Sequence, residues 1–251
     1  MIASTASLKR RASGFTLIEL VAVIVLLGIL SVGTSQFIRQ GVEVYVDTAR
    51  RDNLQQLGRF AVERVNRELQ NALPGSIQIT ASNTCLEFLP ILSASSYIQP
   101  VAIGAMITSI DIVDQNTLVE VGDQLAIYPI DNTSIVSGTA LATVTNVVDN
   151  GDTLTVSISP KTFLLDSPTR RIYIVGSSVE FCAIDDTLSR NGILLAEAVR
   201  IDDDGAFDVF TFSPGNLQRA GIVHVDLRFA DSSQLDEWVR FSQDVSVRNT
   251  P

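Results

Sequence analysis

The chain has 251 residues, which is enough for one globular domain with an anchor or with an inserted subdomain. Its 18 basic and 28 acidic residues give a formal net charge of −10, which argues against nucleic-acid binding because that function needs a basic surface. Two cysteines and one histidine are too few ligands for a structural zinc site, so we expect no metal and no cofactor.

A basic cluster precedes a long apolar run near the N-terminus. Lys9, Arg10 and Arg11 form the cluster, and residues 20–38 carry no charged side chain. As a helix this run is about 28 Å long, close to the hydrocarbon thickness of a bilayer. Because cytoplasmic flanks carry the excess of Lys and Arg, we expect the N-terminus in the cytoplasm and the chain after about residue 39 to be exported. A secretory signal peptide is the simpler alternative, but its apolar region is shorter and a cleavage site follows it.

Glu19 stands at the start of this apolar run, where a carboxylate costs several kcal/mol unless something compensates its charge. The stretch Gly14-Phe15-Thr16-Leu17-Ile18-Glu19 resembles the processing site of type IV prepilins and type II secretion pseudopilins. The resemblance implies that a prepilin peptidase cleaves between Gly14 and Phe15 and methylates the new amino group of Phe15. It also implies that Glu19 pairs with the N-terminus of a neighbouring subunit during assembly. The alternative is a carboxylate that simply lies at the level of the lipid headgroups.

The sequence after the apolar run predicts that the helix continues. Apolar residues recur every three or four positions from Val42 to Leu73, with one longer gap, and Pro74-Gly75 is a strong stop signal. We therefore expect one helix over about 16–73, with a transmembrane part at 15–38 and an amphipathic part at 39–73. Major pilins commonly carry a kinking proline in the second half of the apolar run, where this chain has Gln36, so the resemblance favours a minor pilin or a pseudopilin.

Beyond Gly75 the pattern changes to alternation of the kind found in strands, for example at residues 77–80 and 153–158. The predicted fold class is α+β: a long N-terminal helix packed on an antiparallel sheet domain, residues 74–251. Residues 95–173 are rich in strand and turn signals, and we expect them to form an inserted, barrel-like β subdomain.

Cys85 and Cys182 lie in strand-like settings within the exported part, where disulfides are permitted. We expect a disulfide between them, which the chain-entropy model values at up to about 4–5 kcal/mol. Two buried free thiols are the alternative.

Signals for catalysis or ion binding are weak. His224 alternates with valines in a strand pattern, so we expect no Ser-His-Asp site and no enzymatic activity. The acidic residues from Asp202 to Asp208 suggest calcium, but the spacing lacks the alternate oxygen ligands and the distal Glu of an EF-hand. A solvated turn between strands is the favoured interpretation.

The last third of the chain, from Phe181 through residues 207–212 and 221–227, resembles larger minor pilins. The pattern is closest to MSHA-pilus biogenesis proteins of the MshO kind and to J-type pseudopilins. The resemblance implies that residues 1–14 are a leader peptide, which prepilin peptidase recognises and removes. Its expected partners are other pilins or pseudopilins and the inner-membrane assembly platform, and the domain after the anchor is expected in the periplasm. A tip adhesin that binds a surface or glycan through residues 95–173 is the alternative of another class.

Overall fold

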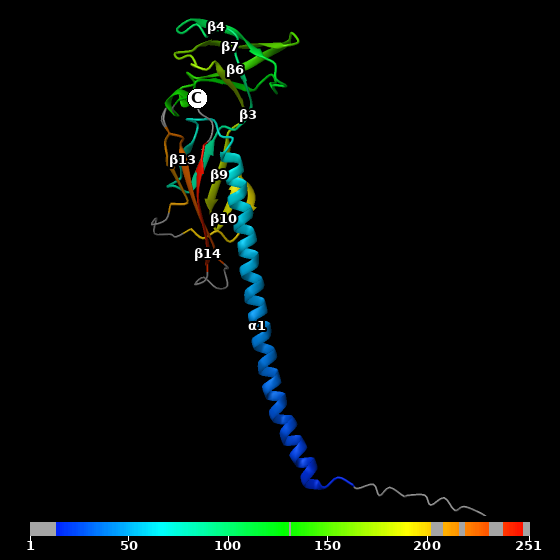
Figure 1. Ribbon diagram of the computed structural model, residues 1–251. Coiled ribbons are helices and arrows are strands. Elements are labelled where there is room, and N and C mark those ends of the chain that lie inside the picture. The colour runs from blue at the N-terminus through cyan, green and yellow to red at the C-terminus, as the bar shows by residue number, and fades with distance from the viewer. Residues whose placement is uncertain (1–13, 131, 202–207, 216–218, 231–237, 248–251) are drawn as a thin grey trace, which may run out of the picture. The chain divides into compact units, whose positions relative to one another are not determined.

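The computed structural model describes residues 14–130, 132–201, 208–215, 219–230 and 238–247 (Figure 1). The chain divides into two compact units, residues 1–51 and 52–251. The first unit consists, over its described part, of the beginning of helix α1 (Leu17–Leu69). Every side chain from residue 14 to residue 53 is exposed, and the helix is long and apolar enough to cross a membrane.

The second unit begins with the remainder of α1, which turns one apolar face toward the sheets. The buried residues recur every three or four positions, as the amphipathic pattern predicted; they are Leu54, Gly58, Ala61, Val62, Val65 and Leu69. The helix ends at Leu69, before the expected end at Leu73. Ala72 forms a bridge with Pro90, and the Leu73 amide donates to the Leu89 carbonyl at 2.8 Å, so this segment pairs with an extended strand.

Two antiparallel sheets pack around this part of α1. The first has the order β1 (Gln78–Thr80), β2 (Cys85–Phe88), β9 (Val179–Ile184), β10 (Thr187–Arg190) and β11 (Ile193–Ala196). The second has the order β12 (Phe210–Ser213), β13 (Ile222–Ala230) and β14 (Trp238–Ser246). Buried residues of both sheets and of α1 share one hydrophobic core, which includes Val65, Phe88, Phe181, Phe210 and Leu227. The α+β fold expected from the sequence is therefore confirmed.

The third sheet closes into a barrel. Its order is β3 (Ile91–Ser96), β8 (Arg171–Val175), β5 (Gln124–Ile127), β6 (Leu141–Asp149), β7 (Thr153–Thr162) and β4 (Met106–Val113). The first and last strands meet, because Tyr97 bridges Ile112 and the Ile98 amide donates to the Asp111 carbonyl at 2.9 Å. Apolar side chains fill the interior, among them Tyr97, Ile112, Leu125, Val156 and Phe163. One short helix, α2 (Asn132–Val136), lies between β5 and β6.

The barrel is inserted at the end of the hairpin formed by β2 and β9. These two strands pair in register up to Phe88 and Val179, and the chain between them builds the barrel. A small apolar cluster that includes Leu73, Ala126, Ile135, Tyr173 and Val175 joins the end of α1 to the outer side of the barrel. The domain limits given above stay predictions; the strands of the barrel run from Ile91 to Val175.

Candidate assembly site on the N-terminal helix

Glu19 and Thr16 form a reciprocal cap at the start of α1. The Glu19 amide donates to Thr16 Oγ1 at 3.3 Å, and the Thr16 amide donates to Glu19 Oε2 at 3.4 Å. Thr16 Oγ1 also lies 3.4 Å from Glu19 Oε2. This is the capping-box arrangement, in which a Thr and a Glu three residues later satisfy backbone donors that lack partners within the helix. The Thr-x-x-Glu spacing is present in the sequence, but neither interpretation of Glu19 given above, pairing with a neighbouring subunit or a position at the lipid headgroups, includes this cap.

The predicted processing residues lie just outside this cap. Gly14 and Phe15 are exposed and precede the first helical residue, Leu17. The bond between them is therefore exposed and lies outside the helix, where a peptidase could reach it. The predicted basic cluster, Lys9, Arg10 and Arg11, lies outside the described residues. Cleavage, methylation and the intermolecular role of Glu19 stay predictions.

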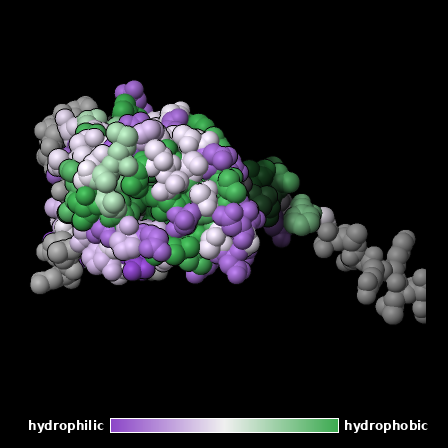
Figure 2. Space-filling view, turned by 90° about the horizontal axis from the view of Figure 1, so that it is seen from above, coloured by the Kyte–Doolittle hydropathy of each residue, from purple (hydrophilic) through white to green (hydrophobic). Residues whose placement is uncertain are grey.

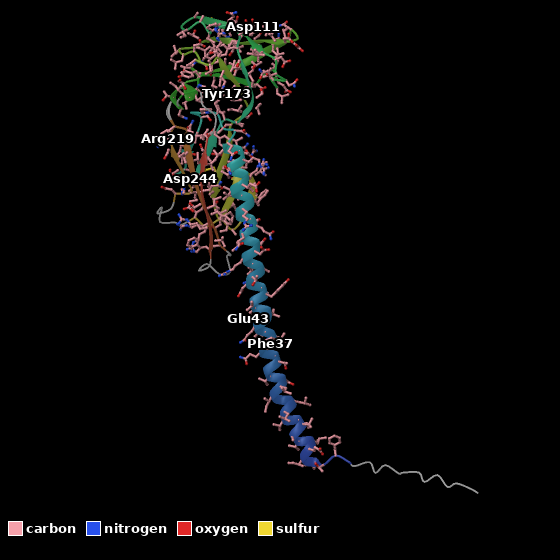
Figure 3. All side chains as sticks on the ribbon, in the orientation of Figure 1. Phe37, Glu43, Asp111, Tyr173, Arg219 and Asp244 are labelled. Carbon is pink, nitrogen blue, oxygen red and sulfur yellow. A yellow bond between two sulfur atoms is a disulfide. The ribbon has the colours of Figure 1, made fainter. Side chains whose placement is uncertain are left out.

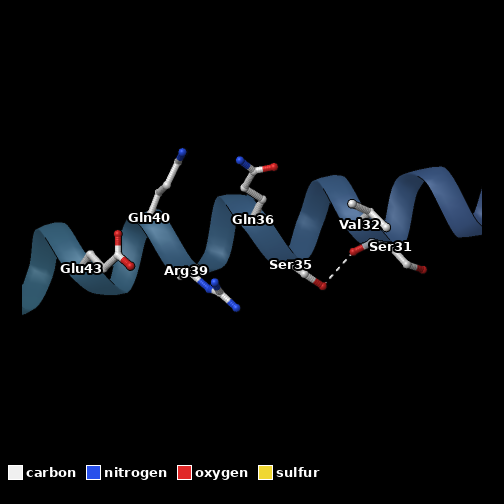
Figure 4. Close-up of a pocket in the computed structure, with 7 residues that line it drawn as sticks. All are labelled: Ser31, Val32, Ser35, Gln36, Arg39, Gln40 and Glu43. Atoms are coloured by element: carbon white, nitrogen blue, oxygen red, sulfur yellow. Dashed lines mark hydrogen bonds between the residues drawn. The ribbon is translucent and has the colours of Figure 1, made fainter.

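The side chains of the apolar run are exposed, and its few hydroxyl groups donate hydrogen bonds to backbone carbonyls of the same helix. Ser31 donates to the Leu27 carbonyl at 2.7 Å, and Ser35 donates to the Ser31 carbonyl at 2.8 Å (Figure 4). Thr34 bonds in the same way to the Leu30 carbonyl. Bonding to the preceding turn satisfies these groups without water, which suits a helix in lipid.

The character of the helix surface changes after this run. Gln36, Arg39, Gln40 and Glu43 bring polar and charged groups to neighbouring turns (Figure 4), and Phe37 and Glu43 project from the helix in Figure 3. The predicted end of the transmembrane part at residue 38 stays a prediction.

Cys85 and Cys182 form a disulfide between β2 and β9. They are direct partners in the strand register, and their Cα atoms lie 4.2 Å apart. Both are buried, and Glu180 lies close enough to complete a group of three possible metal ligands. Because both sulfurs are bonded to each other, neither is a thiolate that could bind a metal ion.

His224, the residue considered in the sequence for a catalytic role, lies beside an acidic and a hydroxyl side chain. His224 lies on β13, and its Nδ1 is 2.6 Å from Asp244 Oδ1 on β14; Ser242 Oγ lies 3.4 Å from His224 Nε2. The sequence interpretation missed this grouping, although strand alternation places residues 242 and 244 on one face. The Ser–His distance exceeds that of a nucleophile–base pair, and the three residues lie on the exposed face of a sheet (Asp244 in Figure 3).

The acidic segment considered for calcium falls partly outside the described residues, which omit 202–207. Asp208 is described, and one of its carboxylate oxygens accepts a hydrogen bond from Asn83 Nδ2 at 2.7 Å.

Comparison with known proteins gives one match. Residues 9–35 match the family model described as the prokaryotic N-terminal methylation motif. No curated protein and no solved structure matches the chain. The matched segment contains Gly14, Phe15 and Glu19 together with most of the apolar run. The methylation motif supports a protein of the type IV prepilin and pseudopilin class, and the candidate membrane-spanning helix found among the described residues, followed by antiparallel sheets, gives a pilin-like α+β fold.

Proposed function

We propose that this protein is a minor pilin of a type IV pilus of the MSHA kind. In this proposal prepilin peptidase removes residues 1–14, and the mature subunit waits in the inner membrane with its β-rich domain in the periplasm. It then enters the fibre through its N-terminal helix and primes or caps assembly, together with other pilins and the assembly platform.

The observation that carries the proposal is the exposed apolar surface of α1, with a single carboxylate at its start. Every side chain from residue 14 to residue 53 is exposed. Such a surface needs lipid or the helices of other subunits around it. Glu19 is the one ionisable side chain between Leu17 and Ile38.

The physical chemistry of assembly follows from that carboxylate. A free α-amino group at Phe15 is cationic at neutral pH, and the helix N-terminus adds partial positive charge. A carboxylate among packed apolar helices pairs strongly with such a terminus because the local dielectric is low. The cap with Thr16 holds Glu19 at its own helix end until a neighbour supplies that cation.

The test separates the two roles of Glu19. Glu19→Gln keeps a side chain that can form a capping box but removes the charge. Thr16→Val keeps the charge but removes the hydroxyl. We expect Glu19→Gln to be processed normally yet to be absent from sheared fibres, and Thr16→Val to be incorporated. If Glu19→Gln enters fibres at the wild-type level, the charge-pairing role is wrong and capping is sufficient.

A second candidate is a J-type pseudopilin of a type II secretion system, which uses the same anchor chemistry. Deleting the gene distinguishes the minor pilin from the pseudopilin. Loss of fibres with normal protein secretion favours the minor pilin, and loss of protein secretion with normal fibres favours the pseudopilin.

The closed barrel at the end of the β2–β9 hairpin favours a third candidate, a pilus-tip adhesin. If residues 89–178 are replaced by a short turn, lost attachment with normal piliation supports adhesion. Lost piliation supports an assembly role for the barrel.

A further inference from the structure

Two cysteine side chains and one carboxylate lie together on the outer face of the first sheet. The sulfur atoms of Cys85 and Cys182 and a carboxylate oxygen of Glu180 are all within 4.8 Å of one another. Glu180 precedes Cys182 by two residues on β9, so both side chains share a face, and Cys85 lies directly opposite on β2. Leu86 and Phe181 alternate with them and pack into the core shared with α1. Figure 1 shows β9 below the barrel, so the group does not belong to the barrel surface, which Figure 2 shows from above as a mixture of apolar and polar side chains.

The carboxylate of Glu180 is available as a ligand. Its backbone is fixed, because the Glu180 amide donates to Asn191 Oδ1 and the Asn191 amide donates to the Glu180 carbonyl, both at 2.8 Å. Among the residues that the structure describes, no hydrogen bond or ion pair involves its carboxylate oxygens. Glu87 lies directly opposite, and its Oε1 accepts a hydrogen bond from Ser178 Oγ at 2.5 Å. Two carboxylates in facing positions repel each other, and a cation bound by Glu180 would relieve that repulsion.

The two cysteines supply ligands only when the disulfide between them is reduced. Reduction adds two electrons and two protons and gives two thiols, whose deprotonated forms bind metal ions. Cysteine thiolates and a carboxylate are ligands that Zn²⁺ accepts, and four-coordinate zinc with three protein ligands keeps one position for water. The sequence count of possible zinc ligands included the cysteines and the histidine but not this carboxylate.

We propose that the dithiol form of the protein binds one Zn²⁺ ion through Cys85, Cys182 and Glu180, and that the ion and the disulfide exclude each other. The dithiol is the form in which a chain is synthesised, before it reaches an oxidising compartment. Binding of Zn²⁺ displaces the two thiol protons. Oxidation by a small disulfide then forms the Cys85–Cys182 bond, reduces the small disulfide to two thiols with two protons from water, and releases Zn²⁺. The ion therefore protects the cysteines until an oxidant displaces it.

The experiment measures zinc binding to the full chain, purified in detergent without a histidine tag. A water-soluble phosphine reduces the disulfide, takes the oxygen of one water molecule and leaves two thiols. After the phosphine is removed under argon, competition with a coloured chelator measures Zn²⁺ affinity, and Co²⁺ replaces Zn²⁺ as an optical probe. We expect one Zn²⁺ site per reduced chain and a thiolate-to-cobalt charge-transfer band. The oxidised chain and Cys85→Ser/Cys182→Ser should show neither, and zinc held by His224 would appear in all three samples as background.

Two isosteric substitutions at facing positions test the carboxylate ligand. Glu180→Gln is expected to lower the Zn²⁺ affinity of the reduced chain by about tenfold or more, since even residues that only support a ligand change metal affinity by about 10- to 100-fold. Glu87→Gln is the matched control, because it removes the same charge from the facing strand, and we expect its affinity to be close to that of wild type. If the two variants lose affinity equally, or if neither loses it, Glu180 is not a ligand and the proposal is wrong.

Unfolding followed by Trp238 fluorescence shows whether the reduced chain keeps its fold. We expect Zn²⁺ to raise the denaturant midpoint of the reduced wild type and to leave that of the oxidised protein unchanged, because only the dithiol binds the ion. Zn²⁺ should also slow the formation of the disulfide by oxidised glutathione, in proportion to the fraction of the chain that holds the ion. The proposal is overturned if the reduced chain binds no Zn²⁺, whether it is folded or not, or if the oxidised chain binds the ion equally well.

Discussion

Gly58 allows α1 to approach β14, and replacing it by alanine tests how the helix docks on the sheets. A Cβ atom at this position would lie 2.0 Å from Phe241 Cε2, 2.4 Å from Cδ2 and 2.7 Å from Cζ. Real contacts are longer than 3.0 Å, so the ring must move. The ring also packs edge-on against Phe229, with centroids 5.9 Å apart, and that contact is disturbed when it moves.

The expected magnitude follows from three contributions. Overpacking costs about 1–3 kcal/mol. Disturbing the aromatic pair costs about 0.5–1.5 kcal/mol. Alanine gains about 1 kcal/mol over glycine in a helix interior. We therefore expect Gly58→Ala to lower the free energy of unfolding by about 2 kcal/mol.

Chemical unfolding of the detergent-solubilised full chain, followed by tryptophan fluorescence, provides the measurement. The single tryptophan is Trp238, which begins β14 three residues before Phe241 and therefore reports on this sheet. Gly41→Ala is the matched control, because no atom lies within 4 Å of a Cβ placed there. It should leave the Trp238 transition unchanged or stabilise it slightly. Phe241→Leu should rescue Gly58→Ala in a double-mutant cycle.

The reasoning is refuted if Gly58→Ala unfolds at the same denaturant concentration as wild type, or at a higher one. That result would mean that Phe241 has a second position of equal free energy and that Gly58 does not control the approach of α1.

Three further outcomes are expected. Mass spectrometry of the protein from cells that contain prepilin peptidase should find N-methylated Phe15 as the first residue; an intact leader would contradict the processing prediction. Replacing Cys85 and Cys182 by serine should lower the free energy of unfolding by up to about 4–5 kcal/mol, and reductant should destabilise wild type but not the variant. Joining Phe88 to Val179 by a short turn in place of residues 89–178 should leave a folded protein with the Cys85–Cys182 disulfide formed, because both strands keep their register; a product with free thiols would show that the barrel is needed for folding.

The N-terminal features could be predicted from the sequence because they depend on residues close together in the chain. The length of the apolar run, the basic cluster, the spacing from Gly14 to Glu19 and the three-to-four periodicity are all local. The capping box is equally local and could have been found from Thr16 and Glu19 alone. The end of α1 was placed four residues late, since the pairing of Ala72 with Pro90 competes with the helix and depends on a strand that comes later.

The tertiary structure decided what depends on partners far away in the chain. The two cysteines could be counted in the sequence, but only strand pairing places Cys85 directly opposite Cys182. Closure of the barrel by Tyr97 and Ile112, the contact of Gly58 with Phe241 and the pairing of His224 with Asp244 likewise join separate strands. The alternation of side chains along a strand tells which of them share a face of the sheet. It does not tell which other strand pairs with that strand. Neighbouring strands are selected by the packing of the whole core. The sequence by itself therefore determined the apolar helix and its N-terminal methylation motif, and the tertiary structure determined the barrel and the pairing of its strands.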